Sequence, residues 1–157
     1  HLSDQSFWQA MDIFEGPILA SHHNCRALVP GDRQLDDKQI KELISRGAVI
    51  GAAFDNWMIK PDYIKKVTPA ETVSMEDVVN HIDHVCQLAG NTNHSGIGTD
   101  LDGGFGKEQC PGDLDTIADL TTIAEILDSR NYSTEDIEKI MSKNFIQFFE
   151  RSLPSAG

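Results

Sequence analysis

The sequence is short of cysteines, of long apolar runs and of basic residues. Its 157 residues include only 3 cysteines and no C-x-x-C pair, so neither a disulfide framework nor a cysteine-ligated zinc knot is expected and a reducing compartment is favoured. No apolar run approaches the roughly 20 residues that cross a bilayer, and no signal peptide opens the chain. Lys and Arg number 13 against 25 Asp and Glu, and the formal net charge of -12 argues against a nucleic-acid partner.

The composition that remains is that of a globular domain. The hydrophobic fraction is 39% and the charged fraction is 24%. Acidic residues are spread over most of the chain, which is typical of a solvated surface, and the length allows one domain with a substantial core. The first residue is His1 rather than Met, so we expect that processing or truncation has removed whatever preceded it.

Helical and strand-like patterns alternate along the chain. Two apolar stretches, at residues 18–20 and 48–54, are predicted as buried strands, and residues 95–100 are predicted as a short strand interrupted by Gly96 and Gly98. The predicted helices occupy residues 4–15, 37–46, 76–89, 114–128, 135–142 and 145–151. Strands that alternate with helices indicate parallel βαβ units. A closed barrel needs eight strands and about three are visible here, so the chain is expected to be part of a larger domain.

A polar side chain lies at or just beyond the end of each predicted strand. These side chains are His22, Asp55 and Asp100. Parallel α/β folds place their working residues at the carboxyl ends of strands, so all three are candidates for metal binding or acid–base catalysis. The rival interpretation of Asp100 is an aspartate that only caps the next helix. The long connection at residues 55–72 is also expected to have a function, because loops of this length are uncommon in compact domains.

Several segments resemble, in the same order, those of the renal (membrane) dipeptidase family of zinc metallopeptidases. They are HLSD at 1–4, PILASH at 17–22, RQLDD at 33–37, EDVVNHIDH at 76–84, GIGTDLDG at 96–103 and NFI at 144–146. The resemblance runs along the whole chain. It implies that residues 1–157 are the C-terminal half of a single (β/α)8 TIM barrel of the metallo-dependent hydrolase type, whose N-terminal half is absent from this chain.

The resemblance also implies roles for individual residues. Two zinc ions would occupy a complete active site, and His1 and His22 would ligate one of them through neutral imidazole nitrogens. A metal-bridging hydroxide would be the nucleophile, Asp100 would hand a proton to the leaving amine, and Arg33 would hold the terminal carboxylate of the dipeptide. The family's His-x-Asp pair, its bridging carboxylate and a further histidine lie upstream of this chain, so the segment alone is expected to be inactive.

Three positions depart from the family pattern. His23 stands where the family has Ser, Gln34 stands where it has Asn, and Phe54-Asp55 stands where many relatives have Tyr. An acidic Asp55 beside the substrate would favour a basic or free amino end of the substrate, unless its side chain points away. These departures affect the expected specificity for particular dipeptides more than the expected hydrolytic chemistry.

The function implied by the resemblance is zinc-dependent hydrolysis of dipeptides, including those with a D-residue at the C-terminal position. Asp100 would be catalytic, Arg33 and Asp55 would bind substrate, and His1 and His22 would bind metal. Two alternatives stay open: a catalytically silent barrel with a binding or structural role, and a related barrel hydrolase of another small amide. The only partner indicated is the dipeptide substrate, and a homodimer is compatible with the sequence.

Other histidines and a cysteine have simpler interpretations. His23 could replace His22 as a ligand, although the phase of the strand favours His22. His81 and His84 have the spacing of a helical metal pair, but no third ligand accompanies them, so both are expected to be structural or surface residues. Cys25, three residues after His22, could be a nucleophile, but a small buried cysteine is the commoner case.

Overall fold

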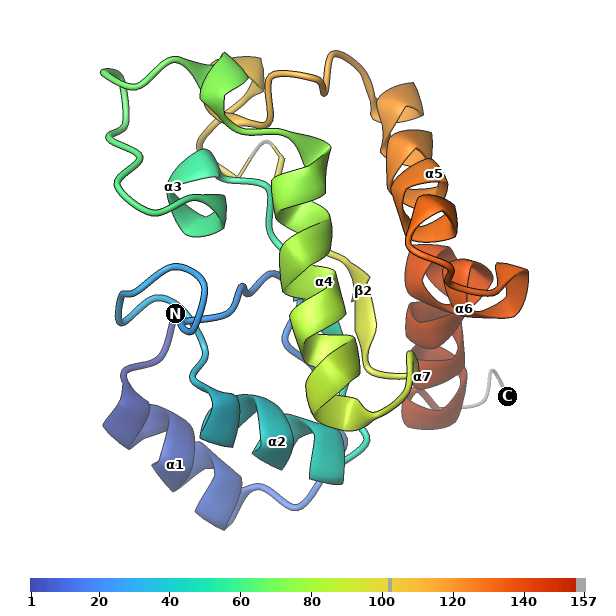
Figure 1. Ribbon diagram of the computed structural model, residues 1–157. Helices are drawn as coiled ribbons and strands as arrows, with labels where there is room; N and C mark the ends of the chain where they lie inside the picture. The colour runs from blue at the N-terminus through green and yellow to red at the C-terminus, as the bar shows by residue number, and fades with distance from the viewer. Residues whose placement is uncertain (102, 155–157) are drawn as a thin grey trace.

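The computed structural model describes residues 1–101 and 103–154, and helices predominate in these ranges. The helices are α1 (Asp4–Ile13), α2 (Asp37–Ser45), α3 (Asn56–Ile59), α4 (Met75–Ala89), α5 (Thr121–Ser129), α6 (Thr134–Glu138) and α7 (Asn144–Ser152). The strands are β1 (Ile50–Ala52) and β2 (Ser95–Ile97). Figure 1 shows α4 through the middle of the molecule, α1 and α2 together below it, and α5 to α7 along one side.

Three parallel segments lie side by side in chain order. β1 pairs with β2 in parallel, with Ile50 opposite Ser95. The predicted strand at 18–20 joins the other edge of β1 through a single bridge between Ala20 and Ile50. The Ala20 N–H donates to the Val49 carbonyl (3.0 Å), and the Gly51 N–H donates to the Ala20 carbonyl (2.8 Å). The order and direction of the segments agree with the predicted βαβ units.

The strand lengths predicted from the sequence are wrong. β1 covers three residues instead of 48–54, β2 covers three instead of 95–100, and the segment 18–20 forms only a bridge. Within the described part of the chain that segment pairs along one edge only, which is too little hydrogen bonding to define a strand. A continuous apolar run marks burial, and burial extends here beyond the residues that pair regularly.

Side-chain caps set most helix limits. At the start of α2, the Gln39 N–H donates to Asp36 Oδ1 (2.8 Å) and the Asp36 N–H donates to Gln39 Oε1 (2.9 Å), a reciprocal capping box. Gly90 ends α4 in the left-handed conformation, with φ of 68°. The helix predicted at 114–128 begins later than expected, because the capping box of Thr116 opens a 3₁₀ turn (Ile117–Leu120) that leads into α5.

The C-terminal helices also differ from the prediction. The helix expected at 135–142 ends at Glu138, and one π-helical turn (Lys139–Lys143) joins α6 to α7. Two further 3₁₀ turns lie in the connections: Ala70–Thr72 precedes α4, and Lys107–Gln109 follows β2. Among the described residues, no helix combines the length and apolarity needed to cross a membrane.

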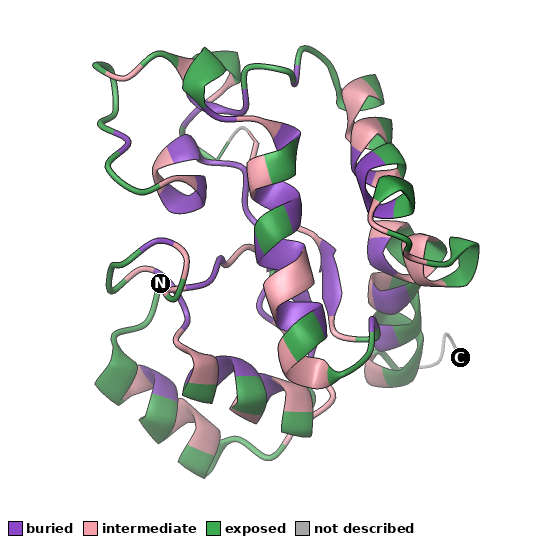
Figure 2. Cartoon of the chain, in the orientation of Figure 1, coloured by how far each residue is buried: buried purple, intermediate pink, exposed green. Residues whose placement is uncertain are grey.

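Two apolar clusters build the core, and α4 contributes to both. Val78 and Ile82 face the cluster shared with α5 and β1, whereas Val85 faces the cluster shared with α1 and α2. Figure 2 shows the resulting pattern, with buried residues over the inner faces of α4 and α2 and exposed residues on their outer faces. The three cysteines are buried and free, as expected from their spacing.

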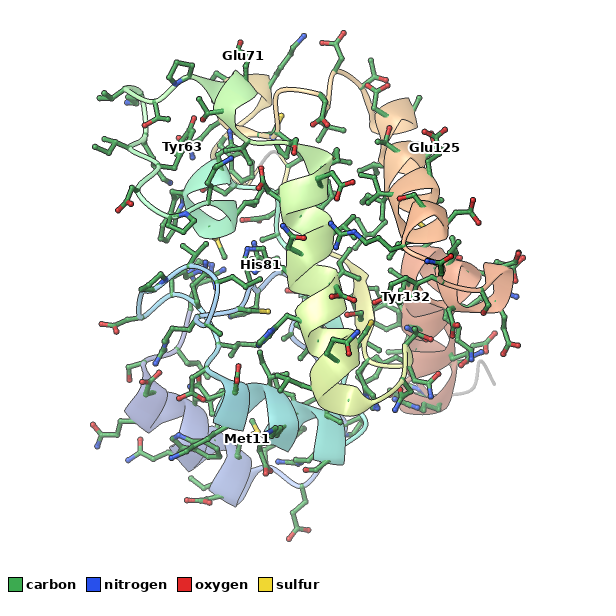
Figure 3. All side chains as sticks on the ribbon, in the orientation of Figure 1. Met11, Tyr63, Glu71, His81, Glu125 and Tyr132 are labelled. Atoms are coloured by element: carbon green, nitrogen blue, oxygen red, sulfur yellow. The ribbon has the colours of Figure 1, made fainter. Side chains whose placement is uncertain are left out.

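His81 is a structural residue of α4, as predicted. It is buried, and it points from α4 toward the loops that carry the polar residues (Figure 3). Its Nδ1 accepts from the Cys25 N–H (3.1 Å), and its Nε2 lies 3.1 Å from the Ile59 carbonyl, to which it can only donate. One ring nitrogen accepts and the other donates, an arrangement that only the neutral imidazole provides. His84 lies nearer the surface, with Nε2 2.8 Å from Asp37 Oδ1.

Acid is expected to destabilise the fold through His81. Burial lowers the pKa of His81 to about 4, from about 6.5 in the unfolded chain. Because the folded pKa is the lower one, the unfolded state binds the proton more readily, and stability is lost as pH falls from about 6.5 to about 4. The loss should reach about 3 kcal/mol. Urea unfolding of the metal-free protein across this range measures it.

The variant His81→Gln isolates this contribution. Glutamine cannot titrate, so its free energy of unfolding should lose this part of the pH dependence, whereas the His84→Gln control should keep it. Equal pH slopes for the wild type and His81→Gln would contradict the assignment.

Candidate active site at the carboxyl ends of the strands

The five residues singled out in the sequence come together at one end of the parallel segments. His1, Arg33, Asp55 and Asp100 line one cavity of about 180 Å³, and His22 contacts His1 at its edge. The other residues of the cavity wall are Trp57, Met58, Lys65, Gly103, Gly104, Phe105 and Gln109. Residues as distant in the sequence as His1 and Asp100 therefore share one pocket.

The imidazoles of His1 and His22 converge. Their Nε2 atoms are 3.3 Å apart and their rings are tilted by 55°. Two nitrogen ligands at about 2.0–2.1 Å from a tetrahedral zinc ion lie about 3.3 Å apart, so the pair fits one zinc. Ser21 Oγ lies 2.8 Å from His22 Nδ1, and this contact orients the ring so that Nε2 faces His1. No group of three or more His, Cys, Asp or Glu suited to a metal occurs among residues 1–101 and 103–154, so a metal held by this pair would need further ligands from outside this set.

His23 stacks on His22, with ring centroids 5.7 Å apart, but it lines a different cavity. That cavity, of about 240 Å³ between α1 and α2, is more apolar and also includes His1 and Arg33, but not Asp55 or Asp100. Burial, with a smaller effect from the Arg33 charge, lowers the pKa of His23 to about 3. The imidazole is therefore neutral, and the geometry favours His22 over His23 as the partner of His1.

The guanidinium of Arg33 has one nitrogen without a partner among the described residues. Its Nη2 donates to the His22 carbonyl (3.1 Å) and lies 3.4 Å from His1 Nε2. Its Nη1 is buried and has no hydrogen-bond partner in the described part of the chain. A buried guanidinium nitrogen without a partner is costly, and a ligand carboxylate is the group best shaped to satisfy it.

Arg26 links the segments that carry His1 and Arg33, and the sequence analysis did not predict this role. Its guanidinium donates to both carboxylate oxygens of Asp4 in α1, at 2.9 and 2.7 Å. It also donates to the carbonyls of Gly31 (3.1 Å) and Gln34 (2.9 Å). These contacts tie the start of α1, next to His1, to the loop that carries Arg33. No local sequence pattern indicated this role, because the contacts join residues up to 22 positions apart.

Asp55 lies in the cavity wall, but its carboxylate is already engaged. Oδ1 accepts from Gln109 Nε2 (2.7 Å), and Oδ2 accepts from Trp57 Nε1 (2.6 Å) and Lys65 Nζ (3.1 Å). The residue is 6% exposed. Three donors therefore surround a buried carboxylate, and none of them was expected from the sequence as its partner.

Asp100 follows β2 in a strained turn. Its φ is 59°, a left-handed conformation that is uncommon outside glycine. The Gly103 N–H donates to the Asp100 carbonyl (2.9 Å), which closes the turn. A Cβ on Gly103 would lie 2.3 Å from Asp100 Oδ1, so glycine is required at that position. The turn directs Asp100 into the cavity that it shares with Arg33.

Cys25 is not a nucleophile. It is 1% exposed, and burial raises the pKa of its thiol to about 12. The thiol form predominates at neutral pH and is shielded from the cavity, so Cys25 is the small buried residue that was expected.

Two glycines allow the strands to approach each other below the site. A Cβ on Gly98 would lie 1.8 Å from the Ser21 carbonyl oxygen, and one on Gly51 would lie 2.3 Å from it. Ser21 directly precedes His22. The position of the His22 imidazole therefore depends on the absence of a side chain at both glycines.

Comparisons with known proteins point to one family. The family model described as membrane dipeptidase, peptidase family M19, matches residues 1–153. Dipeptidase tcpJ of Claviceps purpurea is 30% identical over 147 residues, which cover 94% of this chain and 32% of that protein. An uncharacterized protein from the pqqA 5′ region of Klebsiella pneumoniae is 28% identical over 148 residues, with coverage of 94% and 51%. The chain thus spans about half or less of the curated relatives that it matches.

Solved structures agree with this. A metallopeptidase of family M19 described as dipeptidase AC matches with a TM-score of 0.84 and 25% identity, over 97% of this chain and 42% of that one. A metallopeptidase from Rhodobacter sphaeroides, solved with a phosphinate mimic of the dipeptide L-Ala-D-Ala, matches with a TM-score of 0.83 and 24% identity, over 97% and 41%.

Proposed function

The chain belongs to the membrane dipeptidase family, peptidase family M19, and on this premise we propose that it is the C-terminal half of a (β/α)8 barrel whose complete form is a zinc-dependent dipeptidase. The adjacent parallel segments, with helices between them, support a half-barrel. The coverage supports it as well, because the chain spans 42% of dipeptidase AC. The other strands and the remaining metal ligands would belong to the preceding half of the barrel.

The convergence of His1 and His22 carries the proposal. Their Nε2 atoms are 3.3 Å apart, the spacing of two ligands on one zinc ion, and they lie beside the unused donor of Arg33. The second zinc would take its ligands from the preceding half of the barrel. When bound, the two ions would supply Lewis acidity and a hydroxide nucleophile near neutral pH.

Arg33 would bind the terminal carboxylate of the dipeptide. Its Nη2 is anchored on the His22 carbonyl, so the guanidinium is held in place before the substrate arrives. Its Nη1 would then gain the partner that it lacks. A carboxylate fixed here would place the peptide bond next to the histidine pair, which is the positioning that the reaction needs. Asp55 would complete the wall of this pocket.

Asp100 would move the proton. Its side chain faces the cavity that contains His1 and Arg33, held there by the turn through Gly103. As general base it would accept the proton released when water ionises to hydroxide, and as general acid it would donate that proton to the amine nitrogen while the C–N bond breaks. The products are two amino acids, and the carboxylate of Asp100 is regenerated.

Dipeptides are the proposed substrates, including those with a D-residue at the C-terminal position. The Rhodobacter sphaeroides neighbour was solved with a mimic of such a dipeptide. A pocket of about 180 Å³ suits a small substrate rather than a folded polypeptide.

Zinc analysis together with dipeptide hydrolysis tests the proposal on the complete protein. We expect about two zinc ions per complete chain, hydrolysis that stops on chelation, and recovery when zinc is added back. Turnover of another small amide instead of dipeptides would favour a related barrel hydrolase. One metal or none, with no turnover, would favour a catalytically silent barrel.

A further inference from the structure

Lys65 is the least expected residue of the pocket wall. It lies in the connection between α3 and the Ala70–Thr72 turn, and its Nζ is 3.1 Å from Asp55 Oδ2. The same Nζ lies 4.9 Å from the centre of the Trp57 ring. The side chain of Lys65 is 47% exposed, whereas that of Asp55 is 9% exposed. The ammonium group thus forms the outer end of this pair, at the mouth of the cavity.

The carboxylate of Asp55 has little capacity left for a ligand. Both oxygens already accept hydrogen bonds, from Gln109 on one side and from Trp57 and Lys65 on the other. A substrate amine would have to displace one of these donors from a buried site. Lys65 differs in this respect, because its ammonium has three N–H donors, and those not directed at Asp55 are free to meet a ligand.

The same cavity contains a second cation. Arg33 lines the same cavity of about 180 Å³, and its Nη1 has no partner in the described part of the chain. Two carboxylates belong to the described part of the wall: Asp55 accepts hydrogen bonds at both oxygens, and Asp100 has the proton-transfer role proposed above. A ligand therefore meets two separate cationic donors, one buried and one at the mouth.

We propose that Lys65 selects substrates with a second carboxylate, namely dipeptides with an Asp or Glu side chain. This inference rests on the proposed function, in which Arg33 takes the main-chain carboxylate. The side-chain carboxylate then meets the ammonium of Lys65. Asp55 is a positioning residue, because it holds Lys65 and Trp57 at the mouth while its own oxygens stay turned away from the ligand.

Lys66 provides a matched control. It is the next residue on the same loop and carries the same charge, but it lines a shallow surface hollow with Glu71 and Lys107 instead of the cavity. The variants Lys65→Met and Lys66→Met remove the same charge and keep a similar aliphatic stem. A general effect of net charge would change the selectivity of both variants. Loss of a contact in the pocket would change the selectivity of Lys65→Met alone.

The experiment compares dipeptides that differ only in charge, with the complete protein at low ionic strength. The pairs are Ala-Glu with Ala-Gln and Glu-Ala with Gln-Ala, so that they also locate the acidic side chain. For the wild type, kcat/KM should be about five- to tenfold higher for the acidic member of one pair. In Lys65→Met this ratio should fall to about one, and in Lys66→Met it should be unchanged.

Calorimetric binding of the same pairs to the metal-free protein separates the two proposals, because it needs no turnover. Charge-selective binding that Lys65→Met removes supports the role of Lys65, even if no dipeptide is hydrolysed and the proposed function fails. Hydrolysis without any preference for acidic dipeptides overturns the role of Lys65 and leaves the proposed function intact. A preference for Ala-Lys that Asp55→Asn removes also overturns it, because Asp55 would then meet the substrate directly.

Discussion

Replacement of His22 by alanine is expected to remove one zinc ion and most of the activity of the complete protein. His22 Nε2 lies 3.3 Å from His1 Nε2, and alanine leaves the imidazole of His1 without its neighbour. Loss of residues that merely orient a metal ligand typically costs 10–100-fold in affinity or activity, so loss of a ligand should lower kcat/KM by more than about a hundredfold. The zinc content should fall from about two ions per chain to about one.

His84→Ala is the matched control for this experiment. It also removes one imidazole, but His84 lies on α4 and contacts Asp37 of α2, outside the cavity. Its zinc content and kcat/KM should equal those of the wild type. Full activity and full zinc content in His22→Ala would refute the assignment of this histidine as a ligand, and His23 would then be the residue to replace next.

The location of the site could be predicted from local sequence alone. His22, Asp55 and Asp100 each follow an apolar segment, and the carboxyl ends of parallel segments must meet at one edge of a sheet. The structure has that arrangement, although regular pairing is shorter than the apolar runs. The three residues reach the same edge because the direction of the segments, rather than their exact length, decides where their ends lie.

The contacts of Asp55 could not be predicted in this way. Its partners Lys65 and Gln109 lie 10 and 54 positions away, in connections without periodicity. The sequence indicated a carboxylate near the substrate, but it could not show which donors surround that carboxylate. Arg26 was missed for the same reason, since loops that pack against each other leave no repeating pattern.

The glycines of the third predicted strand indicate a close approach of backbone, but they do not identify which segment approaches. Gly96 and Gly98 interrupt the third predicted strand, and a glycine inside a strand indicates a bulge or a close approach of backbone. Which backbone approaches is a property of the tertiary structure. For Gly98 it is the carbonyl of Ser21, 77 positions earlier in the chain.

Gly98→Ala is therefore expected to displace the metal site, although it adds a single methyl group remote from the substrate. The new Cβ would lie 1.8 Å from the Ser21 carbonyl oxygen, so backbone must move by about 1 Å or more, and His22 would move with it. A misplacement of this size can cost about a hundredfold in rate. Both kcat and zinc content should fall, with a loss of stability of about 1–3 kcal/mol from overpacking.

A graded series of alanine variants shows whether the close approach itself is the cause. The clash at Gly51 is smaller, 2.3 Å to the same oxygen, so Gly51→Ala should lose less activity than Gly98→Ala. At Gly106 the nearest atom is the flexible Glu108 carboxylate at 3.1 Å, and Gly106→Ala should keep its zinc and its activity. Urea unfolding of each variant identifies those that simply fail to fold. A folded Gly98→Ala protein with normal zinc content and turnover would mean that the Ser21–His22 backbone tolerates the shift, and the strands would not then fix the ligand.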